Sequence, residues 1–85
     1  MNLQLISGQF PQQDALDIIT QMVNIKIRYH EKKIVGNSNE EDIKNREAKI
    51  KRLQKELYEI RKKMLLTPGT LSMDASVNLA EGMAN

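Results

Sequence analysis

The sequence has no cysteine and only one histidine, His30, among its 85 residues. Disulfide bonds are therefore excluded, and one imidazole without thiols cannot supply the usual nitrogen and sulfur ligands of a zinc site. A chain of this length forms one small domain, whose core seldom contributes more than about 3 to 5 kcal/mol of net stability. Because neither disulfides nor a metal can add stability, the sequence predicts self-association, and it predicts no cofactor.

Long apolar runs are also missing, and no segment approaches the roughly 18 apolar residues of a membrane span. The first ten residues, MNLQLISGQF, lack the basic start and long apolar stretch of a secretory signal. We therefore expect a cytoplasmic protein with no membrane partner. The four glycines are scattered and form no phosphate-binding loop. His30 has no evident serine and carboxylate set for nucleophilic catalysis, so we expect a protein that is not an enzyme.

Charge is unevenly distributed, although the formal net charge is only +2. All 13 lysines and arginines lie between residues 26 and 63, together with seven of the 11 acids. This segment therefore carries a formal charge of +6, and the two flanks together carry −4. This polarity is the strongest compositional indication of a partner.

Two long helices are predicted, over residues 11–35 and 39–66. Pro11 suits the first helical position, and Gly36 can take the positive φ that ends the first helix. Ser38 and Glu41 have the spacing of a capping box at the start of the second helix. That helix carries a heptad seam of apolar residues, which are Ile43, Ile50, Leu53, Leu57, Ile60 and Met64. The short connection makes the two helices antiparallel.

The two ends of the chain have less regular patterns. Residues 1–10 are predicted to form an N-terminal arm or a short strand. Residues 67–85 begin with TPGT, which ends a helix, and are predicted to form a flexible tail or a short helix from about Met73 to Gly82. The predicted fold class is therefore all-α, an antiparallel two-helix hairpin.

The first helix has more apolar surface than one neighbouring helix can cover, because its apolar side chains spread over an arc of roughly 200°. Leaving that surface in water would forgo roughly 1.5 to 3 kcal/mol for each large side chain. We therefore predict a homodimer that forms a four-helix bundle. The alternatives are a different protein partner, or the C-terminal tail, covering the same face. The predicted dimer interface consists of Leu16, Ile19, Met22, Val23 and Ile27.

Polar side chains interrupt this surface near the hairpin loop. Lys26, His30 and Lys33 recur at helical spacing, and in an antiparallel pair they lie opposite Arg46 and Glu47. Glu47 is the acid expected to approach Lys26 or His30, because a buried cation without a partner is costly. We interpret these five residues as a polar layer that fixes register and assembly state. The alternatives are a ligand or proton-sensing site built on His30, and simple exposure at a frayed helix end.

A basic stripe follows the outer surface of the second helix. It consists of Lys44, Lys51, Lys55 and Lys62, with Tyr58 beside them. At 1.5 Å per residue it extends roughly 27 Å. Such a stripe can follow a phosphate backbone while the tyrosine stacks on a base, and it can also receive an acidic protein partner. The alternative is a solvated helix face whose charges pair at i and i+4.

Residues 7–34 resemble a group of small uncharacterised bacterial proteins. The shared pattern is a Phe near the start of the first helix and a Lys-Ile-x-aromatic-His run near its end. In this chain the pattern is formed by Phe10, Lys26, Ile27, Tyr29 and His30. The resemblance covers about a third of the chain and implies no activity.

The leading functional prediction is a non-enzymatic interaction, scaffold or regulatory protein that acts as a homodimer. The first alternative is a weak nucleic-acid-binding protein that uses the basic stripe. The second is a small helical enzyme of chorismate-mutase type, in which inward lysines and arginines stabilise a dianionic transition state. The DALD run at residues 14–17 is slightly similar to the start of that family's first helix, but the family's early arginine is missing.

Overall fold

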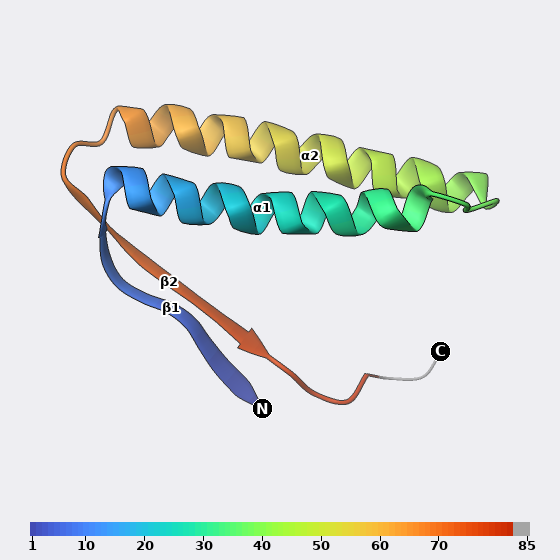
Figure 1. Ribbon diagram of the computed structural model, residues 1–85, viewed down its shortest axis with the longest axis horizontal. Coiled ribbons are helices and arrows are strands. Elements are labelled where there is room, and N and C mark those ends of the chain that lie inside the picture. Colours follow the sequence, from blue (N-terminus) through green and yellow to red (C-terminus); the bar gives the residue numbers. More distant parts are fainter. Residues whose placement is uncertain (83–85) are drawn as a thin grey trace.

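The computed structural model describes residues 1–82 and contains two helices and two strands in this range. In chain order these are β1 (Asn2–Pro11), α1 (Gln12–Ile34), α2 (Glu40–Leu65) and β2 (Thr70–Asn78). The two helices form an antiparallel hairpin, and the two strands pair into a ribbon that leaves the open end of the hairpin (Figure 1). Both predicted helices are present, and each end lies one residue from the predicted position.

The prediction of an all-α fold was wrong, because the strands make this a mixed α/β protein. β2 lies where a flexible tail or a short helix was expected. Its sequence alternates apolar and polar residues with the period of two that is typical of a strand, and the apolar positions are Leu71, Met73, Ala75 and Val77. The four-helix bundle predicted for a dimer is not confirmed, because each chain contributes a ribbon as well as two helices. Residues 83–85 of the expected tail lie outside the described residues.

The ribbon has one apolar and one polar face. Phe10 pairs with Leu71, and Ile6 pairs with Ala75, so these side chains share a face. The register shifts at a bulge between Gln4 and Ile6. In a regular strand, residues three positions apart face opposite sides. The bulge adds one residue to β1, and Leu3 therefore lies on the same face as Ile6. The bulge therefore makes the apolar face continuous to the end of the ribbon.

The loop between the helices is fixed by local hydrogen bonds. Gly36 has φ +76°, as predicted for the residue that ends α1. The N-cap of α2 is Asn39, whose side-chain oxygen accepts from the amides of Glu41 at 3.0 Å and Asp42 at 3.1 Å. The predicted capping box on Ser38 was wrong by one residue. An asparagine serves equally well as an N-cap, because its oxygen reaches the same free amides.

The fold is flat and has very little interior. Its principal extents are 47, 31 and 15 Å. Within residues 1–82 the buried apolar side chains are Ala15, Ile27 and Met64. In the same range, neither helix is both long enough and apolar enough to cross a membrane. Most apolar side chains therefore lie on surfaces that the chain itself covers only in part.

Candidate functional site

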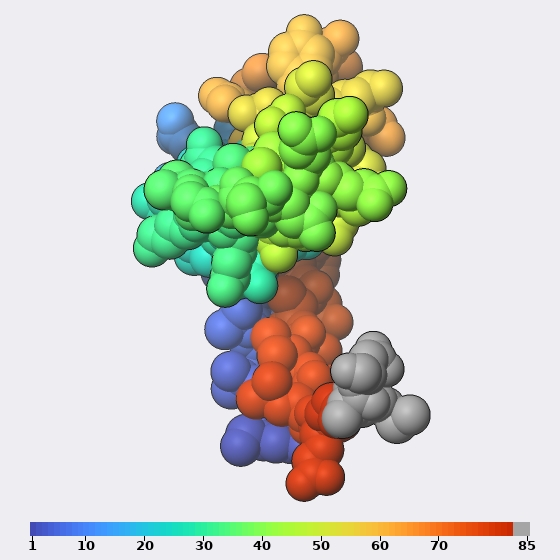
Figure 2. All heavy atoms as spheres, turned by 90° about the vertical axis from the view of Figure 1, so that its right-hand side faces the viewer, coloured from blue at the N-terminus to red at the C-terminus, as the bar shows by residue number. Residues whose placement is uncertain are grey.

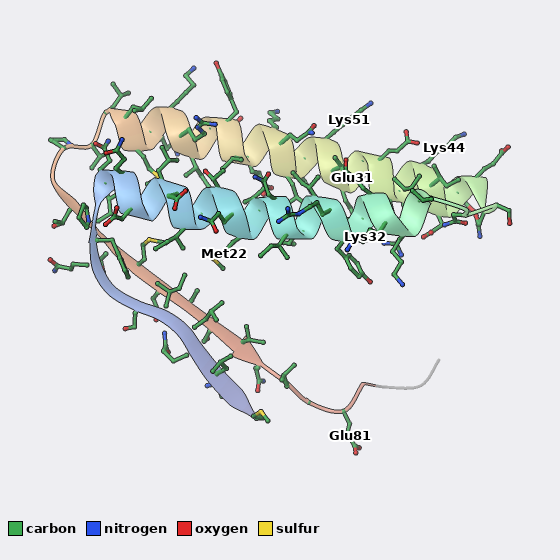
Figure 3. The ribbon with its side chains drawn as sticks, in the orientation of Figure 1. Met22, Glu31, Lys32, Lys44, Lys51 and Glu81 are labelled. Carbon is green, nitrogen blue, oxygen red and sulfur yellow. The ribbon has the colours of Figure 1, made fainter. Side chains whose placement is uncertain are left out.

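The most prominent apolar feature is a groove between the ribbon and the helical hairpin, which we call the wedge groove. The ribbon and the hairpin are joined at one end and diverge from there (Figure 1), and Figure 2 shows the ribbon to one side of the helices. The groove between them has a volume of about 730 Å³. Ile19, Met22 and Val23 of α1 line one wall, and Ile6 and Met73 of the ribbon line the other. Met22 points from α1 toward the side of the ribbon (Figure 3).

The walls of the wedge groove become more exposed as they diverge. Ala15 in the first turn of α1 is fully buried, whereas Ile25 is 60% exposed and Tyr29 is 54% exposed. On the ribbon, Leu3 at the far end is 52% exposed. Ile18, Met22, Ile25 and Tyr29 are spaced by four, three and four residues, so they form one ridge along α1. The ribbon therefore covers the start of this ridge and leaves the rest in water.

The exposed area exceeds that of a compact chain of the same mass. The accessible surface is 7128 Å² for 9.8 kDa. A compact monomer of that mass exposes about 5,200 Å². The radius of gyration is 15.9 Å, against about 12 Å for a compact domain of this length. About 1,900 Å² per chain therefore corresponds to surface that a globular fold of this size would bury.

The residues predicted as a dimer interface are divided between two surfaces. Ile19 and Met22 line the wedge groove, and Val23 lies at its inner edge beside Leu53 of α2. Ile27 is buried, and a second hollow between the helices places it beside Leu57. Leu16 is half-buried. The wide apolar arc of α1 is thus covered by α2 on one side and partly covered by the ribbon on the other.

A polar cluster lies between the helices near the hairpin loop. The Arg46 Nη1 atom donates a hydrogen bond to Nδ1 of His30 at 3.1 Å, because an arginine can only donate. The Arg46 Nε atom pairs with Oδ2 of Asp42 at 3.0 Å. The Asn37 side chain donates to the same oxygen at 2.6 Å. His30 is therefore held as the neutral tautomer that carries its proton on Nε2.

The charges in this cluster shift two pKa values. Hydrogen bonds from Arg46 and Asn37 hold the pKa of the Asp42 carboxyl below its ordinary value. Burial lowers the pKa of His30, and the nearby cations Arg46, Lys49 and Lys26 lower it further. The two pKa shifts favour an ionised Asp42 and a neutral His30, which are the charge states that the hydrogen bonds require.

The predicted polar layer is assembled in a different way from the one expected. His30 and Arg46 are in contact, but the acid that pairs with Arg46 is Asp42, and Glu47 is exposed. The Lys33 ammonium lies 5.8 Å from the centre of the Tyr29 ring. Lys26 lies nearer the ribbon, where it lines the wedge groove. Sequence reasoning missed Asp42, although its position four residues before Arg46 is the spacing of a helical ion pair.

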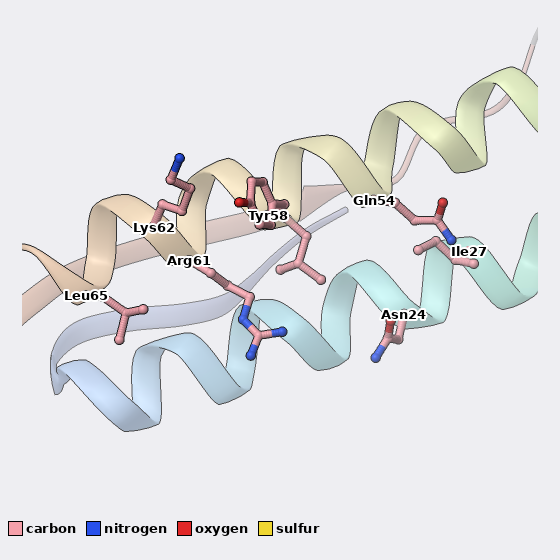
Figure 4. A pocket seen from close by; sticks show the side chains of 8 residues that line it. Asn24, Ile27, Gln54, Tyr58, Arg61, Lys62 and Leu65 are labelled. Carbon is pink, nitrogen blue, oxygen red and sulfur yellow. The ribbon is translucent and has the colours of Figure 1, made fainter.

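The basic stripe lies on the face of α2 that points away from the ribbon. Lys44, Lys51, Lys55 and Lys62 are all exposed, and the first two extend outward from the helix (Figure 3). At its far end the stripe borders a hollow of about 520 Å³ on the flank of the hairpin opposite the wedge groove (Figure 4). Arg61 extends from α2 toward α1 there, and the Lys62 ammonium lies 5.4 Å from the centre of the Tyr58 ring.

Comparison with known protein families, with curated proteins and with solved structures finds no match to this chain. The resemblance of residues 7–34 to a group of small bacterial proteins stays a prediction.

Proposed function

We propose that the protein is a non-enzymatic interaction protein that acts as a homodimer, in which a second copy fills the wedge groove. The observation that carries the proposal is the uncovered apolar surface. About 1,900 Å² of excess surface per chain would give roughly 3,800 Å² for two chains, which lies within the 2,000 to 5,000 Å² of obligate homodimers. A scaffold or regulatory role and a cytoplasmic location are part of the same proposal.

A two-fold arrangement suits both the shape and the charge of the chain. If two wedges interlock, the far end of each ribbon covers Ile25 and Tyr29 of the other copy. The basic segment between residues 26 and 63 then lies near the acidic flanks of the partner, which include Asp74 and Glu81. A second copy thus supplies apolar cover and opposite charge together.

Sedimentation equilibrium tests the proposal directly. We expect a mass of twice 9.8 kDa that persists on dilution. A mass of one chain at all concentrations would refute the homodimer, and the wedge groove would then be a surface for a different protein.

Cysteine cross-linking tests the arrangement, since the chain has no cysteine of its own. One variant carries Tyr29→Cys and another carries Val77→Cys, and the two are mixed and oxidised. A disulfide between them joins two different copies by construction. Replacing the first variant by Leu65→Cys, on the flank away from the wedge groove, should give no such product. Equal yields from both mixtures would contradict the interlocked arrangement.

A second candidate function is weak nucleic-acid binding by the basic stripe. It is supported by the exposure of the four lysines and by Tyr58, a residue that is 63% exposed and whose ring lies beside the Lys62 ammonium. A single strand could lie along the lysines with a base on the tyrosine. Phosphate contacts predict an affinity that falls steeply with salt. Weak binding even at low salt, or binding that survives Lys51→Glu and Lys55→Glu, would exclude this candidate.

A further inference from the structure

A third hollow, which we call the basic hollow, lies on the flank of the hairpin next to the wedge groove. Its volume is about 390 Å³. It is lined by Lys26, His30, Lys49, Arg52, Leu53 and Glu56. Two lysines, one arginine and one histidine therefore line this space, and Glu56 contributes its single carboxylate. The two helices contribute to it jointly, so its geometry depends on how one chain folds and not on a second copy.

The hydrogen bond between Arg46 and His30 determines what the imidazole offers to this hollow. Because Nδ1 accepts from Arg46, the proton of His30 is on Nε2, and within residues 1–82 that N–H has no hydrogen-bond partner and can donate to a ligand. The ammonium groups of Lys26 and Lys49 lie close enough to His30 to lower its pKa. Lys26, Lys49 and Arg52 line the same hollow, so positive charge is concentrated there, and an anion among these side chains would offset it.

We propose that the basic hollow binds a phosphate group, which Arg52 and Lys49 hold from α2 and Lys26 and His30 hold from α1. An arginine guanidinium can bind two phosphate oxygens at once, and the lysines add point charges. The ligand is either a small phosphorylated compound or one phosphate of a nucleic-acid strand. The hollow shares Lys26, Leu53 and Glu56 with the wedge groove, so a second copy in that groove would lie beside the phosphate. His30, Lys49 and Arg52 line the hollow but not the groove, and these three residues distinguish the phosphate site from the proposed dimer contact.

The test is a titration of the full chain at low ionic strength with pyrophosphate, followed by calorimetry and by the NMR signals of the His30 ring. We expect saturable binding, together with a rise in the pKa of His30 as the anion offsets its cationic neighbours. Lys49→Glu should weaken binding about tenfold or more. Lys63→Glu is the matched control, since it makes the same charge change at an exposed position of the same helix, outside both the hollow and the basic stripe, and it should change the affinity by less than about twofold.

A second probe, a single DNA strand of about ten nucleotides, identifies the source of the phosphate. Binding of pyrophosphate alone assigns the hollow to small phosphorylated compounds. DNA binding that Lys49→Glu weakens more than Lys63→Glu assigns it to a strand. Arg52→Gln provides a second variant of the hollow in case Lys49→Glu disturbs the fold. The proposal is overturned if neither probe binds, or if the variants of the hollow and the control weaken binding equally. Sedimentation equilibrium of the same samples measures dimer formation separately. The phosphate site and the homodimer can therefore be refuted independently of each other.

Discussion

The replacement Ile25→Asn should weaken self-association strongly while leaving the chain folded. Ile25 belongs to the part of the α1 ridge that the ribbon leaves in water, and it is 60% exposed in the single chain. Full burial of such a side chain is worth about 1.5 to 3 kcal/mol, so burying the remaining area contributes about 1 to 2 kcal/mol per chain. A two-fold dimer loses this twice, or about 4 kcal/mol at most, which raises the dissociation constant about 30- to 700-fold.

Sedimentation equilibrium over a range of concentrations measures this change, and circular dichroism checks that helix content is retained. Leu65→Asn is the matched control, because Leu65 is 72% exposed but lines the hollow on the opposite flank. It should leave the dissociation constant nearly unchanged. If the two variants have the same effect, the apolar ridge of α1 is not the contact surface, and the reasoning from exposed area is wrong.

Three further predictions concern the stability of the fold. Asn39→Ala should lower the free energy of unfolding by about 1 kcal/mol in urea titrations, because it removes the N-cap, whereas Ser38→Ala should have little effect. Ala15→Leu should cost about 1 to 3 kcal/mol through overpacking at a fully buried position, and Ala48→Leu, at an exposed position of α2, should be nearly neutral in the same titration. The folded chain lowers the pKa of His30 below 6.5, so the unfolded chain binds more protons just below that pH. The free energy of unfolding should therefore be constant above this range and fall as the pH drops through it. In His30→Gln the urea midpoint should no longer change with pH in this range. If the variant keeps the pH dependence of the original chain, His30 is not the group responsible.

The sequence alone predicted the helical hairpin well because its signals are local. The heptad spacing of α2 and the glycine at position 36 each depend on neighbours within a few residues. β2 was missed because its pairing partner lies about 70 positions away, and a strand is stabilised by its partner more than by its own propensity. Its alternation from Leu71 to Val77 was a usable signal, but it includes the small residue Ala75 and is short.

The candidate site was predictable only in part for a related reason. Lys26, His30 and Arg46 were identified because helical spacing alone places them on the inner side of the hairpin. The position of one helix along the other decides which acid pairs with Arg46. It also decides which cations of α2 lie near His30. That position is set by packing and by the loop, so neither Asp42 nor Lys49 could be assigned to the cluster from periodicity.

The pairing of β1 with β2 also orders the steps by which the chain can fold. Pro11 pairs with Thr70, so joining the strands in an unfolded chain would close a loop of 58 residues. The entropy of such a closure is unfavourable, and it must be overcome before any strand contact forms. Once the helices have paired, however, the end of β1 and the start of β2 are already held together at the open end of the hairpin. The ribbon therefore forms late in folding. A substitution that destabilises the hairpin would separate the strands and expose their edges, which favours aggregation.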